Sequence, residues 1–537
     1  MIRIQQVKCP VGHTKEELVS KICHILRIRP QQLVRYSIVR RSLDARKKPE
    51  LFYSYMIDCE LDREKTEKKL CNGKTILKTP EKVYHFPEEG TEKLKERPVI
   101  AGSGPAGLFC AYMLALHGYA PVVIERGANA RERQKAVEHF WETGELSTQT
   151  NVQFGEGGAG TFSDGKLTTR SKDSRCRKVL EELVHFGAKD EILIDQHPHI
   201  GTDAFMEIIK QCRKEIERLG GMFLFDTALQ DIQVKDEKLV SIQFQNQWHP
   251  CTALILACGH SAKDTILMLH THHMELTNKR FAVGVRIEHR QDYINQAMLK
   301  EYAHDPRLIP ARYKLTHMAS NHKGVYTFCM CPGGYVIPAA SEPKHTVING
   351  MSYAKRDGIN ANSALLVQVD ESDYGTKILG GLAYQENLEA KAYQMADGYA
   401  ACCQLASDYL DHKVSTSFGS VQPTYALGTK FVDLNTLFSS PINQALHEAL
   451  EVFEKRVPGF ISSGAILSAV ESRSSSAIRI ARNEQGMSSI FGVYPSGEGA
   501  GYAGGIMTSA IDGIHSAEKL IEYFEKPQYN LEKEGCE

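Results

Sequence analysis

The first 90 residues alternate between apolar and polar positions in a way that predicts a small α/β domain. Residues 2–7, 33–40 and 51–61 carry β-branched and aromatic side chains at alternate positions, as half-buried strands do. Thr14 and Glu17 have the spacing of a capping box, which predicts a helix after the first strand. A polar segment rich in helix and strand breakers follows, and we place the end of the domain within it, at residue 90.

A short apolar strand at residue 98 runs directly into a glycine-rich turn, then a helical segment and a second strand that ends in Glu125. In dinucleotide-binding folds the three glycines of GxGxxG permit a tight turn, a close approach to pyrophosphate and close helix packing. The helix N-terminus offers N–H groups to phosphate, and the acid can accept hydrogen bonds from a ribose diol. The segment therefore predicts dinucleotide binding and disfavours a 2′-phosphate, without separating FAD from NAD. The turn consists of Gly102, Ser103, Gly104, Pro105, Ala106 and Gly107.

Three later segments favour FAD. Residues 154–167 hold five glycines within eleven positions, which suits a backbone wrapped closely around a ligand, although a flexible surface loop has the same composition. Residues 251–259 form an apolar strand that ends at Gly259 and resembles an Ala-Thr-Gly motif of flavoproteins, with Cys258 in place of the threonine. Strand-like segments at 222–247 precede it, as in the β-meander of flavoprotein cofactor domains.

The third segment, residues 492–506, leads from a strand through Gly-Glu-Gly into a helix that we expect to reach about Tyr523. It resembles a second FAD motif in which an acid binds the ribityl chain; Glu498 is one methylene longer than the usual Asp. The helix N-terminus would face the flavin, although small residues before a helix also occur in plain sheet packing. The predicted cofactor contacts beyond the first turn are Glu125, Arg126, Gly157, Gly158, Gly160, Ser163, Asp164, Gly165, Lys166, Ala228, Cys258, Gly259, Gly497, Glu498, Gly499, Gly504, Gly505 and Ile506.

Composition narrows the function classes. A net charge of −1 gives no chain-wide case for nucleic acid or an anionic membrane. No apolar run is long enough for a transmembrane helix, and the N-terminus lacks the apolar stretch of a signal peptide. Fourteen cysteines in a chain of 537 residues indicate reduced thiols, so we expect a cytoplasmic protein. The close cysteine pairs, 329 with 331 and 402 with 403, lack zinc spacing, so no metal site is predicted.

Taken together, these motifs make the chain similar to a known group: the uncharacterised bacterial FAD-dependent dehydrogenases of the glutathione-reductase-like flavoprotein class. The resemblance covers nearly the full length. It implies an α/β fold with three parts: a ferredoxin-like domain at 1–90, a discontinuous Rossmann-type FAD domain at 97–280 and 485–537, and an inserted α+β substrate or cap domain at 281–484. It names no substrate. The segments that carry it are 42–49, 154–167, 328–336, 349–353, 361–364, 471–476 and 494–505.

Four side chains are candidates for catalysis near the flavin. Lys166 and His260 can reach the ring or a bound anion, although the sequence favours a solvated lysine and a satisfied core or surface histidine. Arg286, on a predicted cap strand, can hold a substrate carboxylate or pair with Glu288 at the surface. Arg473 is a possible anion clamp. Cys331 is a weak candidate for a redox thiol, because its CxC spacing is not that of the disulfide reductases.

Two functional hypotheses follow. The first is an FAD-dependent oxidoreductase that transfers hydride to or from a small molecule, an anion among the candidates. No second GxGxxG directly follows a predicted strand, so NAD(P)H would act only as a transient donor. The second is a flavin-binding regulatory or RNA-associated protein without turnover. It depends on the basic segment 40–48, which is otherwise a solvated loop.

Overall fold

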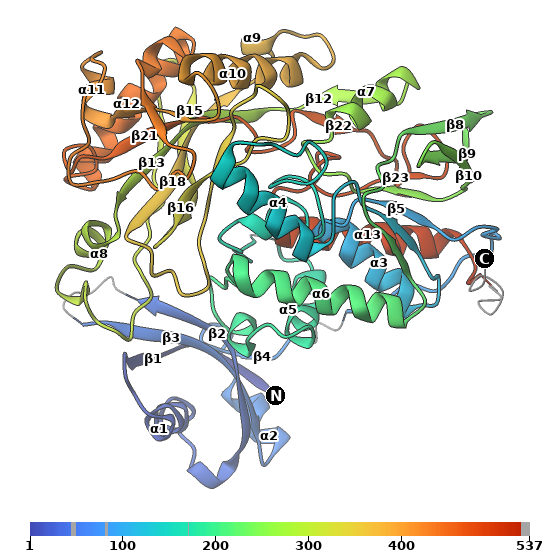
Figure 1. Cartoon of the computed structure of the whole chain (residues 1–537). Helices are drawn as coiled ribbons and strands as arrows, with labels where there is room; N and C mark the ends of the chain where they lie inside the picture. Colours follow the sequence, from blue (N-terminus) through green and yellow to red (C-terminus); the bar gives the residue numbers. More distant parts are fainter. Residues whose placement is uncertain (45–49, 81–83, 170, 528–537) are drawn as a thin grey trace. The chain divides into compact units, whose positions relative to one another are not determined.

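A computed structural model describes residues 1–44, 50–80, 84–169 and 171–527, and the chain divides into two compact units (Figure 1). Each unit is built from segments that are separate in the sequence. The first unit comprises Met1–His85, Lys166–Ile200 and Leu299–Ile309. The second unit comprises Phe86–Gly165, Gly201–Met298 and Pro310–Glu537.

The first unit contains a four-stranded antiparallel sheet with the strand order β2-β3-β1-β4. Together with the chain order β-α-β-β-α-β, this is the arrangement of a ferredoxin-like domain. Leu18, Ile22 and Leu26 recur at helical spacing on α1 and are buried in one cluster with Ile4 and Ile57 of the sheet. The elements are β1 (Ile2–Pro10), α1 (Lys15–Leu26), β2 (Leu33–Asp44), β3 (Phe52–Leu61), α2 (Glu64–Leu70), β4 (Ile76–Lys78) and α5 (Arg175–His185).

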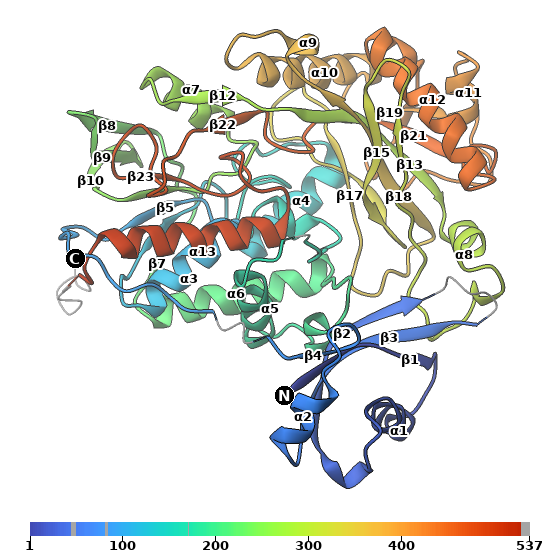
Figure 2. The same ribbon diagram turned by 180° about the vertical axis from the view of Figure 1, so that it is seen from behind.

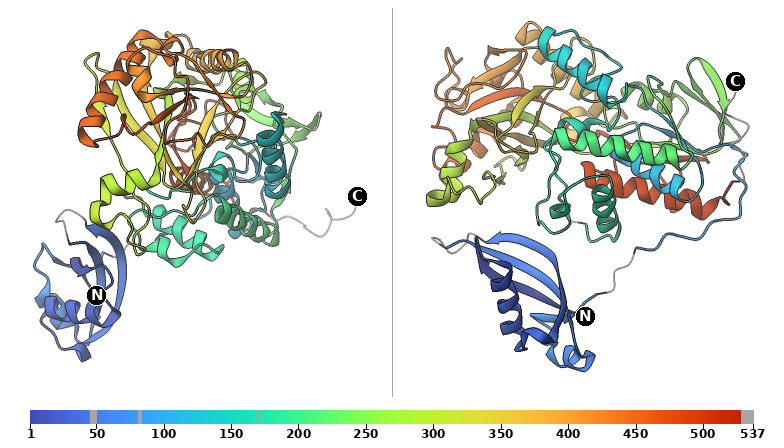
Figure 3. Two further views of the ribbon diagram at one scale, coloured as in Figure 1. Left: turned by 60° about the vertical axis from the view of Figure 1, so that its left-hand side comes forward. Right: turned by 60° about the horizontal axis from the view of Figure 1, so that its bottom comes forward.

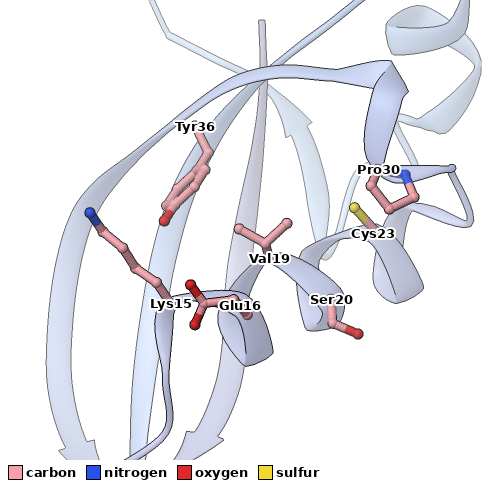
Figure 4. Close-up of a pocket in the computed structure, with 7 residues that line it drawn as sticks. All are labelled: Lys15, Glu16, Val19, Ser20, Cys23, Pro30 and Tyr36. Atoms are coloured by element: carbon pink, nitrogen blue, oxygen red, sulfur yellow. The ribbon is translucent and has the colours of Figure 1, made fainter.

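The expected capping box is present, because Thr14 accepts from the Glu17 amide while the Glu17 carboxylate accepts from Thr14. Helix α1 lies beside this sheet (Figure 3). An open groove lies between α1 and β2, and Tyr36 points across it toward the helix (Figure 4). The groove is lined by Lys15, Glu16, Val19, Ser20, Cys23, Pro30 and Tyr36.

The loop predicted at residues 40–48 is wrong over its first five residues. They continue β2, which pairs with β3 as far as Asp44 opposite Phe52. The charges are tolerated because β2 is an edge strand, and Arg41 is paired with Asp195 at 2.8 Å. Residues 45–48 of the predicted loop lie outside the described part of the chain.

The second unit contains a five-stranded parallel sheet with the order β23-β11-β5-β6-β7. The helices α3 and α13 pack on each other beside this sheet, and α6 packs on α3 (Figure 2). The central strands β5 and β11 and the edge strand β23 have three residues each and are buried on both faces, which explains the short apolar runs in the sequence. These elements are β5 (Val99–Ala101), α3 (Pro105–Leu116), β6 (Val122–Ile124), α4 (Ala130–Thr143), α6 (Thr202–Arg218), β7 (Met222–Leu224), β11 (Leu254–Leu256), α7 (Lys263–Thr271), β23 (Val493–Pro495) and α13 (Ile506–Tyr523).

The β-meander is present but shorter than predicted. Its strands are β8 (Asp231–Lys235), β9 (Lys238–Phe244) and β10 (Gln247–Pro250), which form a three-stranded antiparallel sheet. The first strand-like segment of the predicted stretch, β7, joins the parallel sheet instead, because it continues the order beside β6.

A seven-stranded sheet, β14-β15-β18-β13-β21-β19-β20, forms the other core of this unit. Two helices, α10 and α12, pack on it, and the β16-β17 hairpin also contacts its strands (Figure 1). The elements are β13 (Phe281–Arg290), α8 (Gln291–Leu299), β14 (Thr316–Met318), β15 (Gly324–Cys331), β16 (Tyr335–Pro338), β17 (Ile348–Met351), β18 (Asn360–Val369), α9 (Glu371–Tyr374), α10 (Gly380–Ala396), β19 (Ala401–Leu405), α11 (Ala406–Leu410), β20 (Thr429–Phe431), α12 (Ser440–Arg456) and β21 (Ile466–Glu471).

The chain enters and leaves this sheet region side by side. Strands β12 (Leu276–Asn278) and β22 (Ile478–Ile480) form an antiparallel pair of their own. Among the described residues, the structure contains no helix with the length and hydropathy needed to cross a membrane.

Candidate functional site

The predicted cofactor motifs meet at one edge of the parallel sheet. Gly102 follows β5, Glu125 follows β6, Gly259 follows β11 and Gly497 follows β23, so each motif comes after the carboxyl end of its strand. These four strands are adjacent in the order β23-β11-β5-β6. In open parallel sheets, ligands bind beyond the carboxyl ends of the strands. Motifs from opposite ends of the sequence therefore form one candidate binding edge.

The first glycine-rich turn is packed tightly on the chain at two positions and is open at a third. A β-carbon on Gly102 would overlap the Ala257 carbonyl oxygen, and one on Gly107 would overlap the carbonyl oxygen of Gly102. At Gly104, the N-cap of α3, the nearest atom to an added β-carbon is 3.7 Å away. The turn therefore leaves room in front of the amides of the first turn of α3, where a phosphate would bind.

Glu125 is buried and accepts four hydrogen bonds from the chain itself. Its Oε2 accepts from the amide and hydroxyl of Ser103 at 2.8 and 2.7 Å, and its Oε1 accepts from the amides of Gly127 and Gly155 at 3.0 Å. The carboxylate thus joins the first turn to the loop at 154–165. Its predicted contact with a ribose stays a prediction, since it would compete with these bonds.

Two neighbouring predicted contacts, Arg126 and Cys258, have structural partners, and a third, Ala228, is described by its burial alone. Arg126 is stacked over Phe154 at 4.7 Å and pairs with Asp264 at 2.7 Å. The Cys258 thiol donates to the Ala101 carbonyl at 3.4 Å, and burial raises its pKa to about 12, so it is a neutral thiol. Ala228 is half-buried between β7 and β8.

The loop at 154–165 is held by an arginine that the sequence does not reveal. Arg133 of α4 is fully buried, and its Nε donates to Asn151 at 2.9 Å while its Nη2 donates to Val152 at 2.8 Å. Its Nη1 donates to the carbonyl oxygens of Glu156 and Gly158 at 2.7 and 3.0 Å. The sequence shows only an arginine within a charged helical segment, so no pattern separates it from its exposed neighbours.

The glycines of this loop lie close to both helix N-termini. A β-carbon on Gly158 would come within 2.9 Å of the Gly104 Cα, and one on Gly160 within 2.9 Å of Cγ1 of Ile506, the first residue of α13. Gly157 packs on the Thr161 side chain. The loop therefore borders the candidate cofactor site, as the sequence predicts.

The last residues of the loop have other partners. Ser163 donates to the Gly160 carbonyl at 2.7 Å and accepts from the Gly165 amide at 3.1 Å. Asp164 is fully buried and pairs with Arg356, whose Nε donates to it at 3.0 Å. Lys166 belongs to the first unit, where it forms a β-bridge with His199.

The C-terminal motif completes the edge from the other side. A β-carbon on Gly497 would come within 2.7 Å of Ala106, and one on Gly499 would overlap the Gly259 carbonyl oxygen. In contrast, no atom lies within 4 Å of an added β-carbon at Gly259, Gly504 or Gly505. Gly505 is the N-cap of α13, so the start of this helix faces open space, whereas the start of α3 has Gly158 beside it.

Three titratable side chains gather beside Gly259 and Gly505. Oε1 of Glu498 lies 3.6 Å from Nδ1 of His260, and burial raises the Glu498 pKa to about 7 against the effects of the Gly505 amide and Lys279. Burial and the charge of Arg473 lower the His260 pKa to about 4. Burial also lowers the Lys279 pKa, although Glu498 opposes it. Perturbed pKa values clustered in this way are typical of functional sites.

Two observations at this edge fit a bound cofactor. Nε2 of His260 is buried and has no hydrogen-bond partner among the described residues. The open positions at Gly104, Gly259, Gly504 and Gly505 leave space directly in front of both helix N-termini. An elongated anionic ligand would fill that space and approach the backbone closely, which a side chain at any of these positions would prevent.

Arg286 does not have either role expected from the sequence. It is fully buried, and its Nε and Nη2 donate to Glu471 at 2.6 and 3.0 Å, while Nη1 donates to Asn362 at 2.6 Å. Burial acts to lower its pKa, but the charge and hydrogen bonds of Glu471, together with Cys331 and Cys329, raise it overall. The predicted surface pairing with Glu288 is wrong, because Glu288 is buried and accepts from Thr424 and Asn360.

Arg473 is also occupied by the chain. Its Nε and Nη2 donate to the buried Glu389 at 2.9 and 2.7 Å, and its Nη1 donates to Ser341 at 2.6 Å. The guanidinium therefore has little capacity left for a clamped anion, although its charge reaches His260.

One group of potential metal ligands occurs among the described residues, formed by Glu342, His345 and Glu386. Cations already pair with both carboxylates, since Lys263 contacts Glu386 and Arg473 lies 3.5 Å from Glu342. Cys331, the weak thiol candidate, is buried and donates to the Cys329 carbonyl at 3.1 Å.

Glycine motifs after β5, β11 and β23 and an acid after β6 give this parallel sheet the arrangement of a dinucleotide-binding fold. Residues 280–474 match the family model described as "FAD-dependent protein, C-terminal domain-like", and residues 1–60 match a domain of unknown function, DUF8436. A protein from Clostridium beijerinckii (strain ATCC 51743 / NCIMB 8052) is 43% identical over 531 residues, which cover 98% of this chain and 100% of that protein. The chain belongs to the family of that protein, whose name assigns no activity.

Solved structures match more distantly. Glycine oxidase from Bacillus cereus ATCC 14579 has 12% identity and a TM-score of 0.30, with 79% of this chain and 95% of that chain covered. A mutant of the halogenase PltM in complex with FAD has 10% identity and a TM-score of 0.35, with 78% and 67% covered. Likenesses of this size assign no activity to the chain.

Proposed function

We propose that the chain binds FAD at the carboxyl edge of the parallel sheet and acts as an oxidoreductase on a small molecule. One observation carries the proposal: the turns after β5, β11 and β23 and the acid after β6 converge on a single edge, where α3 and α13 both begin. The match of residues 280–474 to a domain of FAD-dependent proteins supports the same cofactor.

The chain would hold the cofactor from both ends of this edge. The amides of the first turn of α3, in front of Gly104, would bind the pyrophosphate. The N-terminus of α13, at Gly505, would face the flavin ring and favour negative charge there. FAD, when bound, supplies the two-electron chemistry by accepting or giving a hydride.

The chain's own side chains would provide hydrogen bonds and exchange protons beside that ring. His260 is neutral at pH 7, because its pKa is about 4, and its unpartnered Nε2 can form a hydrogen bond to the cofactor or the substrate. Glu498, with a pKa of about 7, gains or loses a proton at Oε1 near neutrality. Lys279 adds positive potential through its effect on Glu498. NAD(P)H would act as a transient donor, since the run at 102–107 is the one GxGxxG that directly follows a strand among the described residues.

The test begins with the purified full chain. We expect a yellow protein whose released cofactor is FAD rather than FMN, and anaerobic bleaching of the flavin by NADH, NADPH or a member of a panel of small metabolites. A colourless protein that takes up no FAD on reconstitution would overturn the cofactor. A yellow protein that no donor in the panel reduces would leave binding intact and contradict turnover.

A further inference from the structure

Two arginines of the second unit share a single carboxylate. Arg356 is 3% exposed, and its Nε and Nη2 are bound to Asp164, whereas its Nη1 is buried and has no hydrogen-bond partner among the described residues. Arg312 is half-buried, and no described residue forms a hydrogen bond or ion pair with its guanidinium. Two buried or half-buried positive charges therefore face one negative charge.

The charges of Arg312, Arg356 and Asp164 act on one another, so the excess positive charge is confined to this place. Burial, and then the charge of Arg356, lowers the Arg312 pKa, and Asp164 opposes this. Asp164 is thus the carboxylate whose charge compensates Arg312, and it is already bound by Arg356. A cation held at a half-buried position without a partner is costly, and a bound anion would remove that cost.

This place adjoins the candidate flavin site. Asp164 follows Gly160 on the same loop, and Gly160 packs on Ile506, the first residue of α13. Arg312 and Arg356 both lie within the segment 280–474 that matches the FAD-dependent C-terminal domain. The excess charge is thus on the part of the chain outside the parallel sheet, beside a loop that borders the cofactor edge.

We propose that Arg312 and Arg356 form a binding site for a carboxylate group of the substrate. The planar fork of Arg312 can donate two parallel hydrogen bonds to a carboxylate, and the free Nη1 of Arg356 can donate another. This inference rests on the proposed oxidoreductase function and specifies its substrate class as small organic acids. Arg286 and Arg473, the clamps expected from the sequence, are occupied by Glu471 and Glu389, whereas Arg312 is not.

The experiment uses the FAD-loaded full chain and two probes, succinate and benzoate, titrated calorimetrically at constant ionic strength with chloride as the balancing anion. We expect saturable binding to wild type, and binding at least about tenfold weaker in R312Q, because a charge-assisted hydrogen bond is lost. R312K should retain part of the affinity, as a point charge without the fork. The matched control K314Q changes an exposed lysine two residues away and should bind like wild type.

Stability provides a second readout that a purely structural arginine would not give. Without added acid, R312Q should unfold at the same temperature as wild type or at a higher one, because the substitution removes an uncompensated charge. With saturating succinate, wild type should become the more stable of the two proteins, because it binds the acid more tightly. FAD content per chain should be equal in all variants, so a failure of the cofactor proposal is seen separately. Any one of four results would overturn the proposal. Two concern the acids: binding that does not saturate, or an equal loss of affinity in R312Q and K314Q. The others are tighter binding of inorganic phosphate than of either acid, and a lower unfolding temperature of R312Q than of wild type without added acid.

Discussion

Gly513 of α13 lies against Ala106 of α3 so closely that a β-carbon at position 513 would overlap the Ala106 carbonyl oxygen. Ala106 lies in the first glycine-rich motif, and α13 begins directly after the last one. This helix crossing therefore aligns two N-termini that come from opposite ends of the chain. Cofactor binding is expected to depend on it.

Replacing Gly513 with alanine should separate the two helices. The overlap is with a backbone atom, which no side-chain rotation can relieve, so we expect a loss of roughly 2–3 kcal/mol in the free energy of unfolding and a loss of bound FAD. Urea unfolding and the ratio of flavin to protein absorbance measure the two effects. G419A is the control, because nothing lies within 4 Å of a β-carbon at Gly419. Wild-type flavin content in G513A would show that the crossing does not position the site.

Arg133 should be required for the loop at 154–165. R133M leaves backbone carbonyls from Asn151 to Gly158 without their donors, and we expect a loss of about 3 kcal/mol or more, because unsatisfied buried polar groups are costly. Flavin content should fall with it. R131Q, on the exposed side of the same helix, serves as the control. Equal protease resistance of the loop in R133M and R131Q would contradict this role.

Glu498 should make stability fall as the pH rises. Its folded pKa is about 7 against an ordinary 4.5, so the folded protein retains a proton that the unfolded chain has lost between these values. The contribution of Glu498 to the free energy of unfolding is present in full below about pH 4.5. It is lost as the pH approaches and passes 7, and the whole loss is about 3 kcal/mol. In FAD-free protein, wild type minus E498Q should show this slope, and wild type minus the exposed control E484Q should not. A flat difference for E498Q would exclude the raised pKa.

The pair formed by Arg286 and Glu471 should stabilise the folded protein rather than bind the substrate. R286M leaves a buried carboxylate unpaired, and we expect a loss of about 3–5 kcal/mol in the free energy of unfolding. R290Q changes a partly exposed arginine on the same strand and should cost little. If R286M were instead stable but showed a raised KM with an unchanged kcat, Arg286 would be the substrate clamp that the sequence suggests.

Local patterns predicted the elements of the cofactor edge closely. Helix α3 begins at Pro105 and has 12 residues, and α13 runs from Ile506 to Tyr523, as expected. Such features depend on neighbours in the sequence: a strand, a glycine turn and a helix start. The error at residues 40–44 has the opposite origin, because pairing with β3 extended a charged segment as an edge strand against its composition.

The partners of charged side chains were not predictable in the same way. No pattern around Arg133, Arg286 or Arg312 shows that the first holds a loop, the second pairs with Glu471, and the third has no described partner. What separates them is which distant segment packs against each guanidinium. A single sequence carries no signal for such contacts, whereas the free energy of a buried charge depends on them strongly.

The sequence by itself determined that this protein has a dinucleotide-binding motif after residue 98, further glycine-rich segments at 154–167 and 492–506, and a capped N-terminal helix, because these features follow from backbone freedom and local spacing. Only the tertiary structure decided that the motifs share one sheet edge, that Glu125 is occupied by backbone amides, and that the free positive charge lies on Arg312. The reason is physical: hydrogen bonds and charge compensation are satisfied in three dimensions, by residues that can be hundreds of positions apart.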